Sequence, residues 1–172
     1  MTDSRDDLRS FALNVHGCDG VASACVLLQD RCGVDVNVLL LAAYVGAVKG
    51  ASVTPADVAA VSARTMPWQR DVIGPLRAVR TGLKVGPPPA PNDATAALRD
   101  AVKAVELEAE LIELNELAAL VACLDAPAAP GSARDRAAAA MLVVTGACRG
   151  LGAGERAAID TIASAAARFG KE

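Results

Sequence analysis

The chain has 172 residues and a formal net charge of −3, and 53% of its residues are hydrophobic while 2% are aromatic. A chain of this length fits one domain that buries about 70% of its unfolded surface, so it needs neither disulfides nor metal to form a core. An acidic chain lacks the basic surface of a general nucleic-acid-binding protein, and so few aromatic side chains cannot stack many bases. We therefore expect no nucleic-acid partner.

The first residues and the cysteines indicate the cellular compartment in which the protein is expected to lie. Residues 1–7 are acidic and lack the apolar region of a signal peptide. The longest apolar run, residues 38–48, is about half as long as the ~20 residues that cross a bilayer. Five cysteines, an odd number without a Cys-x-x-Cys pair, are typical of a reduced protein. We expect a cytoplasmic protein without a membrane span.

Glycines and capping residues divide the first third of the chain into three expected helices. Ser4, with Asp7 three residues later, can begin the first helix, and Gly33 is a typical residue just after the end of the second. Asp35 can cap the third helix, which Gly50 ends. The expected ranges are residues 4–15, 21–31 and 35–48.

Prolines place the next two helices. The segment Thr54-Pro55-Ala56-Asp57 combines a cap, a proline at the first helical position and an acid in the first turn, so it begins a helix that we expect to end near Thr65. Pro67 is expected to begin a fifth helix, kinked at Pro75, through residue 85. Residues 86–92 are expected to form a stiff, extended, proline-rich internal linker.

The last third is also predicted to be helical. Asn92 or Asp93 can cap a long helix that we expect to reach Leu124, because apolar residues recur along it at helical spacing. Ser132 with Asp135 can cap a seventh helix. The expected ranges are residues 92–124, 132–147 and 155–168.

These elements predict an all-α single domain, residues 1–172, arranged as an array or bundle of about seven to eight helices. Alanine and leucine dominate the composition and favour helix over sheet. The segment most compatible with a strand is residues 141–145, which are apolar and partly β-branched.

Two carboxylates lie between strongly apolar segments, at the expected junction of the second and third helices. Asp30 and Asp35 flank Gly33, and Asn37 follows two residues later. Across such a corner the polar side chains can converge on a cation or on the amine of a ligand. The structural alternative is that Asp35 caps the third helix while Asp30 pairs with Arg31 or another arginine.

The expected fifth helix carries the most concentrated basic surface of the chain. Its basic residues are Arg70, Arg77, Arg80 and Lys84. Arginines bind phosphate or carboxylate groups through paired hydrogen bonds, and Trp68 can supply an apolar wall. A matching acidic stripe on the long helix consists of Glu106, Glu110 and Glu113. The structural alternatives to an anion site are that the two stripes face each other or that each is solvated surface.

The pattern of cysteines and histidine does not favour a metal or catalytic site. Cys18, Cys25 and Cys32 are spaced by seven residues, about 10.5 Å along one helix, so neighbouring thiols cannot share a zinc ion or a disulfide. They are better explained as small buried hydrophobic residues. The single histidine, His16, is better placed to cap the first helix than to bind zinc or act as a base. We expect no cofactor, no metal and no catalytic residue.

Four segments of the chain, residues 11–15, 28–30, 33–40 and 75–80, resemble a known family. The most specific part is the block Q-D-x-x-G-x-D-V-N-x-L-L, residues 29–40. The family is a set of small proteobacterial proteins described as conserved hypothetical, with a domain of unknown function, and the resemblance covers residues 11–120. It implies a cytoplasmic bacterial protein without an assigned activity, and it supplies no catalytic residues.

The leading functional hypothesis is a non-enzymatic helical binding or adaptor protein that has a protein partner, with self-association as a homodimer as a further expectation. The alternative is an enzyme or small-molecule-binding protein whose interhelical apolar pocket holds an anionic ligand. The residues expected at the contact surface or ligand site are Asp30, Asp35, Asn37, Trp68, Arg70, Arg77 and Arg80.

Overall fold

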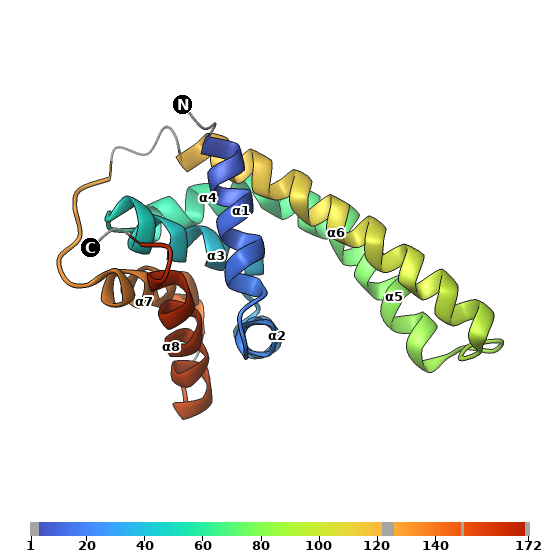
Figure 1. Ribbon diagram of the computed structural model, residues 1–172. Helices are drawn as coiled ribbons and strands as arrows, with labels where there is room; N and C mark the ends of the chain where they lie inside the picture. Colours follow the sequence, from blue (N-terminus) through green and yellow to red (C-terminus); the bar gives the residue numbers. More distant parts are fainter. Residues whose placement is uncertain (1–3, 122–125, 149, 171–172) are drawn as a thin grey trace. The chain divides into compact units, whose positions relative to one another are not determined.

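The computed structural model describes residues 4–121, 126–148 and 150–170. Within these ranges every named element is a helix (Figure 1), which confirms the predicted all-α class. The chain divides into two compact units, Met1–Ser62 with Leu114–Glu172 and Ala63–Glu113. Whether the two units together form one domain stays a prediction.

The centre of the first unit is α3 (Val36–Tyr44). Residues 37–44 of this helix are all buried, because a helix that is apolar all round has no face suited to water. The π-helical turn η1 (Val45–Lys49) continues α3, and the 3₁₀ turn η3 (Thr145–Ala147) continues α7. The helices around α3 are α1 (Ser4–His16), α2 (Val21–Cys32), α7 (Ala133–Val144) and α8 (Ala153–Ala167).

η1 and α7 approach each other closely at Gly46. A Cβ atom on Gly46 would lie 2.5 Å from the carbonyl oxygen of Arg136, which is closer than packed atoms come. The Arg136 Nε donates to the Gly46 carbonyl oxygen at 3.0 Å. Glycine therefore lets the backbone of η1 pack directly against α7.

Two predicted helix starts in the first unit are confirmed by their side-chain caps. The Thr54 N–H donates to Asp57 Oδ2 at 2.9 Å, and the Asp57 N–H donates to Thr54 Oγ1 at 3.2 Å. Ser132 and Asp135 form the same reciprocal box at the start of α7. In each case two N–H groups that have no partner within the helix are satisfied.

The predicted break between the fourth and fifth helices is wrong. α4 (Pro55–Trp68) includes Pro67 and passes directly into the π-helical turn η2 (Gln69–Ile73) and then α5 (Gly74–Val85). In η2 the Gly74 N–H donates to the Gln69 carbonyl oxygen, five residues back. The wider turn accommodates Pro75, which has no N–H to donate. The prolines here accompany a change of helix type and not a helix end.

The second unit contains an antiparallel helical hairpin, in which α5 and the first part of α6 (Asp93–Val121) lie side by side (Figure 1). Residues 86–92 reverse the chain instead of extending as predicted, and the Ala90 N–H donates to the Pro87 carbonyl oxygen at 3.0 Å. Asn92 caps α6, as predicted, by accepting from the Thr95 N–H at 2.9 Å. The predicted end of this helix at Leu124 lies outside the described residues.

Candidate functional site

Asp35 lies at the N-terminus of α3 and acts as its cap. Its Oδ1 accepts a hydrogen bond from the Asn37 backbone N–H at 2.9 Å, and Asn37 is buried in the first turn. Gly33 ends α2 with a left-handed φ of 66°. The capping interpretation of Asp35 is therefore confirmed. Asp30 is exposed, and the predicted pair with an arginine is absent from the part of the chain that the structure describes.

The basic and acidic stripes face each other within the second unit. The Arg77 Nε donates to Glu106 at 3.0 Å, and its Nη2 donates to Glu110 at 2.9 Å. Arg80 forms two hydrogen bonds with the Glu106 carboxylate. Glu106 is only 4% exposed. These ion pairs hold α5 against α6, which is one of the structural alternatives that the sequence left open.

The charges of this cluster are matched. Burial on its own would raise the pKa of Glu106, but hydrogen bonds from Arg80 and Arg77 outweigh it and hold that pKa below its ordinary value. The hydrogen bond to Glu106 raises the pKa of Arg80. Both groups are therefore charged at neutral pH, and each partly buried charge has its partner within the hairpin.

Two other predicted site residues are engaged in the same unit. The Trp68 Nε1 donates to the Ala109 carbonyl oxygen at 3.0 Å, and Arg70 pairs with its neighbour Asp71 on the surface. The sequence placed Arg70 on one stripe with Arg77, which assumes an uninterrupted α-helix. Arg70 instead lies within η2, whose wider turn changes the angular spacing of residues.

The seven predicted site residues are divided between the two units. Asp30, Asp35 and Asn37 lie in the first unit, and Trp68, Arg70, Arg77 and Arg80 lie in the second. Glu113, the third residue of the acidic stripe, accepts a hydrogen bond from Gln69 at 2.8 Å. The anionic-ligand hypothesis stays a prediction, and the two arginines that it most needs already bind carboxylates.

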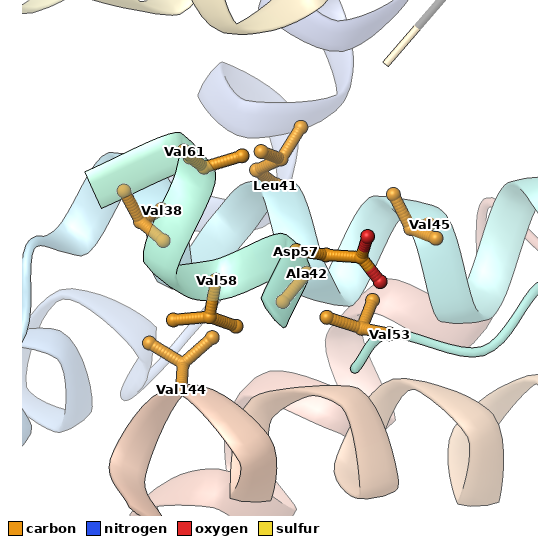
Figure 2. Close-up of a pocket in the computed structure, with 9 residues that line it drawn as sticks. All are labelled: Val38, Leu41, Ala42, Val45, Val53, Asp57, Val58, Val61 and Val144. Carbon is orange, nitrogen blue, oxygen red and sulfur yellow. The ribbon is translucent and has the colours of Figure 1, made fainter. Parts of the chain in front are cut away.

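A pocket in the first unit is almost entirely apolar (Figure 2). It encloses about 280 Å³, part of it open solvent, and neither Asp35 nor Trp68 lines it. Its one carboxylate, Asp57, accepts a hydrogen bond from Thr54 Oγ1 at 2.7 Å. Ligand pockets combine apolar walls with a few convergent polar groups, and this lining provides only a capping carboxylate. The lining residues are Val38, Leu41, Ala42, Val45, Val53, Asp57, Val58, Val61 and Val144.

The feature that sequence reasoning missed is an exposed apolar stripe on the hairpin. On α6, Leu98, Val105 and Ile112 are spaced by seven residues and are 53%, 54% and 50% exposed. On α5, Val79 is 51% exposed, and no residue of that helix is buried. Their repeat was visible in the sequence, but it reads equally as a buried core stripe. The apolar face of the hairpin is defined here as Leu76, Val79 and Leu83 of α5 with Ala94, Leu98, Ala101, Val105 and Ile112 of α6.

Within the described ranges, no group of three or more histidine, cysteine, aspartate or glutamate side chains is arranged to hold a metal ion. No single helix of the described chain is long and apolar enough to cross a bilayer. The pair Asp7–His16 and Val21–Cys32, bent by 96°, is long and apolar enough by length and composition alone.

These features define an all-α protein. It has an ion-paired helical hairpin with an apolar face, and a capped corner between two helices. The chain belongs to the family described as protein of unknown function (DUF2390), which matches residues 7–117. This agrees with the resemblance drawn from the sequence, which covered nearly the same residues. No curated protein and no solved structure matches the chain.

Proposed function

We propose that this protein is a non-enzymatic binding module that associates with a second copy of itself through the apolar face of the hairpin. The observation that carries the proposal is the stripe of half-exposed Leu98, Val105 and Ile112 at seven-residue spacing. Such spacing is typical of helices that pack against another helix. Exposed apolar stripes on one face of a helix mark interaction surfaces more often than isolated exposed residues do.

The apolar residues of α5 and α6 lie on the same side of the hairpin. On each helix one of these apolar residues directly precedes a residue of the ion pairs: Val79 precedes Arg80, and Val105 precedes Glu106. Successive residues are rotated by about 100° around a helix. In two antiparallel helices, the residues that directly precede the contact residues of each helix point to the same side of the pair. The two stripes therefore form one continuous surface.

The size of this surface suits a dimer. From Ala94 to Ile112 the helix is roughly 27 Å long, and two helices side by side are about 20 Å wide. Two copies would then bury on the order of 1,000 Å² in total, which is about the lower bound for a specific interface. The half-exposed side chains would gain most from this burial, because about 25 cal/mol is gained per Å² of apolar area removed from water.

Charge supports a second copy as the occupant and favours an antiparallel pairing. The arginines beside the face are already paired with glutamates, so a surface as apolar as the face itself fits better than a charged one. Glu108 follows Ala101 by seven residues on the same stripe and is exposed. Parallel α6 helices would bring the two copies of Glu108 together, whereas antiparallel helices separate them and oppose large residues such as Val105 to small ones such as Ala101.

The proposal is tested by sedimentation velocity of the full chain over a range of concentrations. The wild type is expected to be dimeric at micromolar concentration. Val105→Asp is expected to weaken dimerisation by more than about 100-fold, because a carboxylate would enter an apolar interface. Lys103→Asp is the matched control, since Lys103 is exposed and lies about 200° around the helix from Val105. The control is expected to remain dimeric.

Two results would overturn the proposal. A wild type that stays monomeric at every concentration would show that the apolar face does not self-associate. A dimer that Val105→Asp leaves intact would show that the copies meet through another surface. Circular dichroism of both variants separates loss of association from loss of fold.

A further inference from the structure

Two cysteines that are far apart in the sequence meet within the first unit. Cys32 is the last residue of α2, and Cys148 directly follows η3. The Cys148 thiol donates to the carbonyl oxygen of Arg31, the residue directly before Cys32, at 3.9 Å, and it lies close enough to Cys32 to raise the pKa of that thiol. Both are free thiols of intermediate exposure, so a small reagent can reach them.

The local structure fixes both thiols at helix ends. Gly33 turns the chain directly after Cys32 with a φ of 66°. Before Cys148, the buried Thr145 donates its Oγ1–H to the Met141 carbonyl oxygen at 3.2 Å and so anchors η3 to α7. Each thiol is thus carried at the end of a helical segment, and the two segments meet where Cys148 contacts Arg31.

We propose that Cys32 and Cys148 form a reversible intramolecular disulfide by exchange with a small-molecule disulfide such as oxidised glutathione. First, one of the two cysteine thiolates attacks one glutathione sulfur, which gives a mixed disulfide and releases one glutathione. Then the thiolate of the other cysteine attacks the protein sulfur of that mixed disulfide, the protein disulfide forms and the second glutathione leaves. Two electrons pass from the cysteines to glutathione disulfide, and the two thiol protons end on the released glutathione molecules.

The surroundings of Cys32 make closure depend on pH. Burial, the interaction with Cys148 and the charge of Glu155 raise the pKa of Cys32 to about 11. Cys32 is therefore protonated at neutral pH, and the thiolate is the attacking species in exchange. Closure is expected to quicken as the pH rises toward the pKa of Cys32.

This device is independent of the proposed dimer, because it lies in the first unit and the hairpin lies in the second. Closing the disulfide joins the end of α2 to the segment that leads into α8. The prediction that Cys18, Cys25 and Cys32 are small buried hydrophobic residues is wrong for Cys18 and Cys32, which are partly exposed. Cys25 does fit that expectation, since it is 1% exposed and burial raises its pKa to about 12.

The test is incubation of the full chain with oxidised glutathione, followed by intact mass measurement and peptide mapping without reduction. The wild type is expected to lose two hydrogen atoms and to yield a peptide pair that contains Cys32 and Cys148. Dithiothreitol is expected to restore the original mass. Cys32→Ser is expected to stop at one glutathione on Cys148, and Cys148→Ser is expected to prevent closure.

Cys18→Ser is the matched control, because Cys18 is also a free thiol of intermediate exposure, and it is expected to close as the wild type does. Wild type that accumulates a stable glutathione adduct without closing would overturn the proposal, as would closure that survives in Cys148→Ser. Thermal melting of each variant shows whether the native fold is present during the reaction. Glu155→Gln is expected to speed closure, because it removes a charge that raises the pKa of Cys32.

Discussion

Arg80 and Glu106 join α5 to α6 through two hydrogen bonds, and the carboxylate is almost fully buried while the guanidinium is partly exposed. Arg77 also donates to the same carboxylate. The Glu106 carboxylate thus binds two guanidinium groups. The contact between α5 and α6 therefore depends on Glu106 more than on either arginine alone.

Glu106→Gln is expected to lower the free energy of unfolding by about 1–3 kcal/mol, because two arginines lose a buried counter-charge while their exposed portions stay solvated. Urea denaturation of the full chain measures the change. Asp71→Asn is the control: it removes the carboxylate of an ion pair that lies on the surface and is expected to leave stability unchanged. Equal effects of the two substitutions would contradict a special role for Glu106.

The same carboxylate predicts an acid-side loss of stability. Arg80 and Arg77 hold the pKa of Glu106 below its ordinary value despite burial, so between the two values the unfolded chain binds the proton more readily. Its contribution is present above the ordinary value of about 4.3 and is lost as the pH falls through the lower folded value. The difference in stability between wild type and Glu106→Gln should therefore shrink on acidification. A constant difference from pH 7 down to strongly acid solution would contradict this.

Gly46→Ala is expected to destabilise the first unit by about 2 kcal/mol or more, since the new Cβ would lie 2.5 Å from the Arg136 carbonyl oxygen and force η1 away from α7. Gly154→Ala is the comparison, because a Cβ at that helical position meets nothing within 4 Å. It is expected to be neutral or slightly stabilising. Thermal melting of both variants checks the prediction, and equal melting temperatures would refute it.

Asp35→Ala is expected to cost about 1 kcal/mol, since the Asn37 N–H loses its acceptor at the start of α3. Asp35→Asn should keep most of that stability, because asparagine caps about as well. Asp30→Ala, at an exposed position, should have no effect on unfolding. If Asp30→Ala proved the more damaging change in urea denaturation, the corner would have a role beyond capping.

Helix positions were predictable from the sequence because they are set locally. The Thr54–Asp57 and Ser132–Asp135 pairs are short-range signals, and the structure forms both boxes. The facing of the arginine and glutamate stripes was one of the two structural alternatives to an anion site, since complementary charges at matching spacing favour contact. The choice between facing stripes and solvated stripes depends on the turn at residues 86–92. Local sequence signals did not predict that this segment reverses the chain.

Other features lay beyond local reasoning. Pro67 is a strong stop signal by propensity, yet it lies inside α4, because tertiary context overrides propensity. Val105 and Ile112 have the spacing of core residues but are half exposed, since periodicity shows that a face is apolar without showing what covers it. Cys32 and Cys148 meet only because the first unit brings distant segments together.

The π-helical turn η2 is equivalent to one residue inserted into an α-helix. The wider turn absorbs the extra residue, so removing one residue, such as Asp71, would let the segment continue as an α-helix with Arg77 and Arg80 still facing Glu106. Removing one residue from α5 before Arg77 would instead rotate both arginines by about 100°, because a regular α-helix cannot absorb the change. A one-residue deletion should therefore be tolerated better in η2 than in α5.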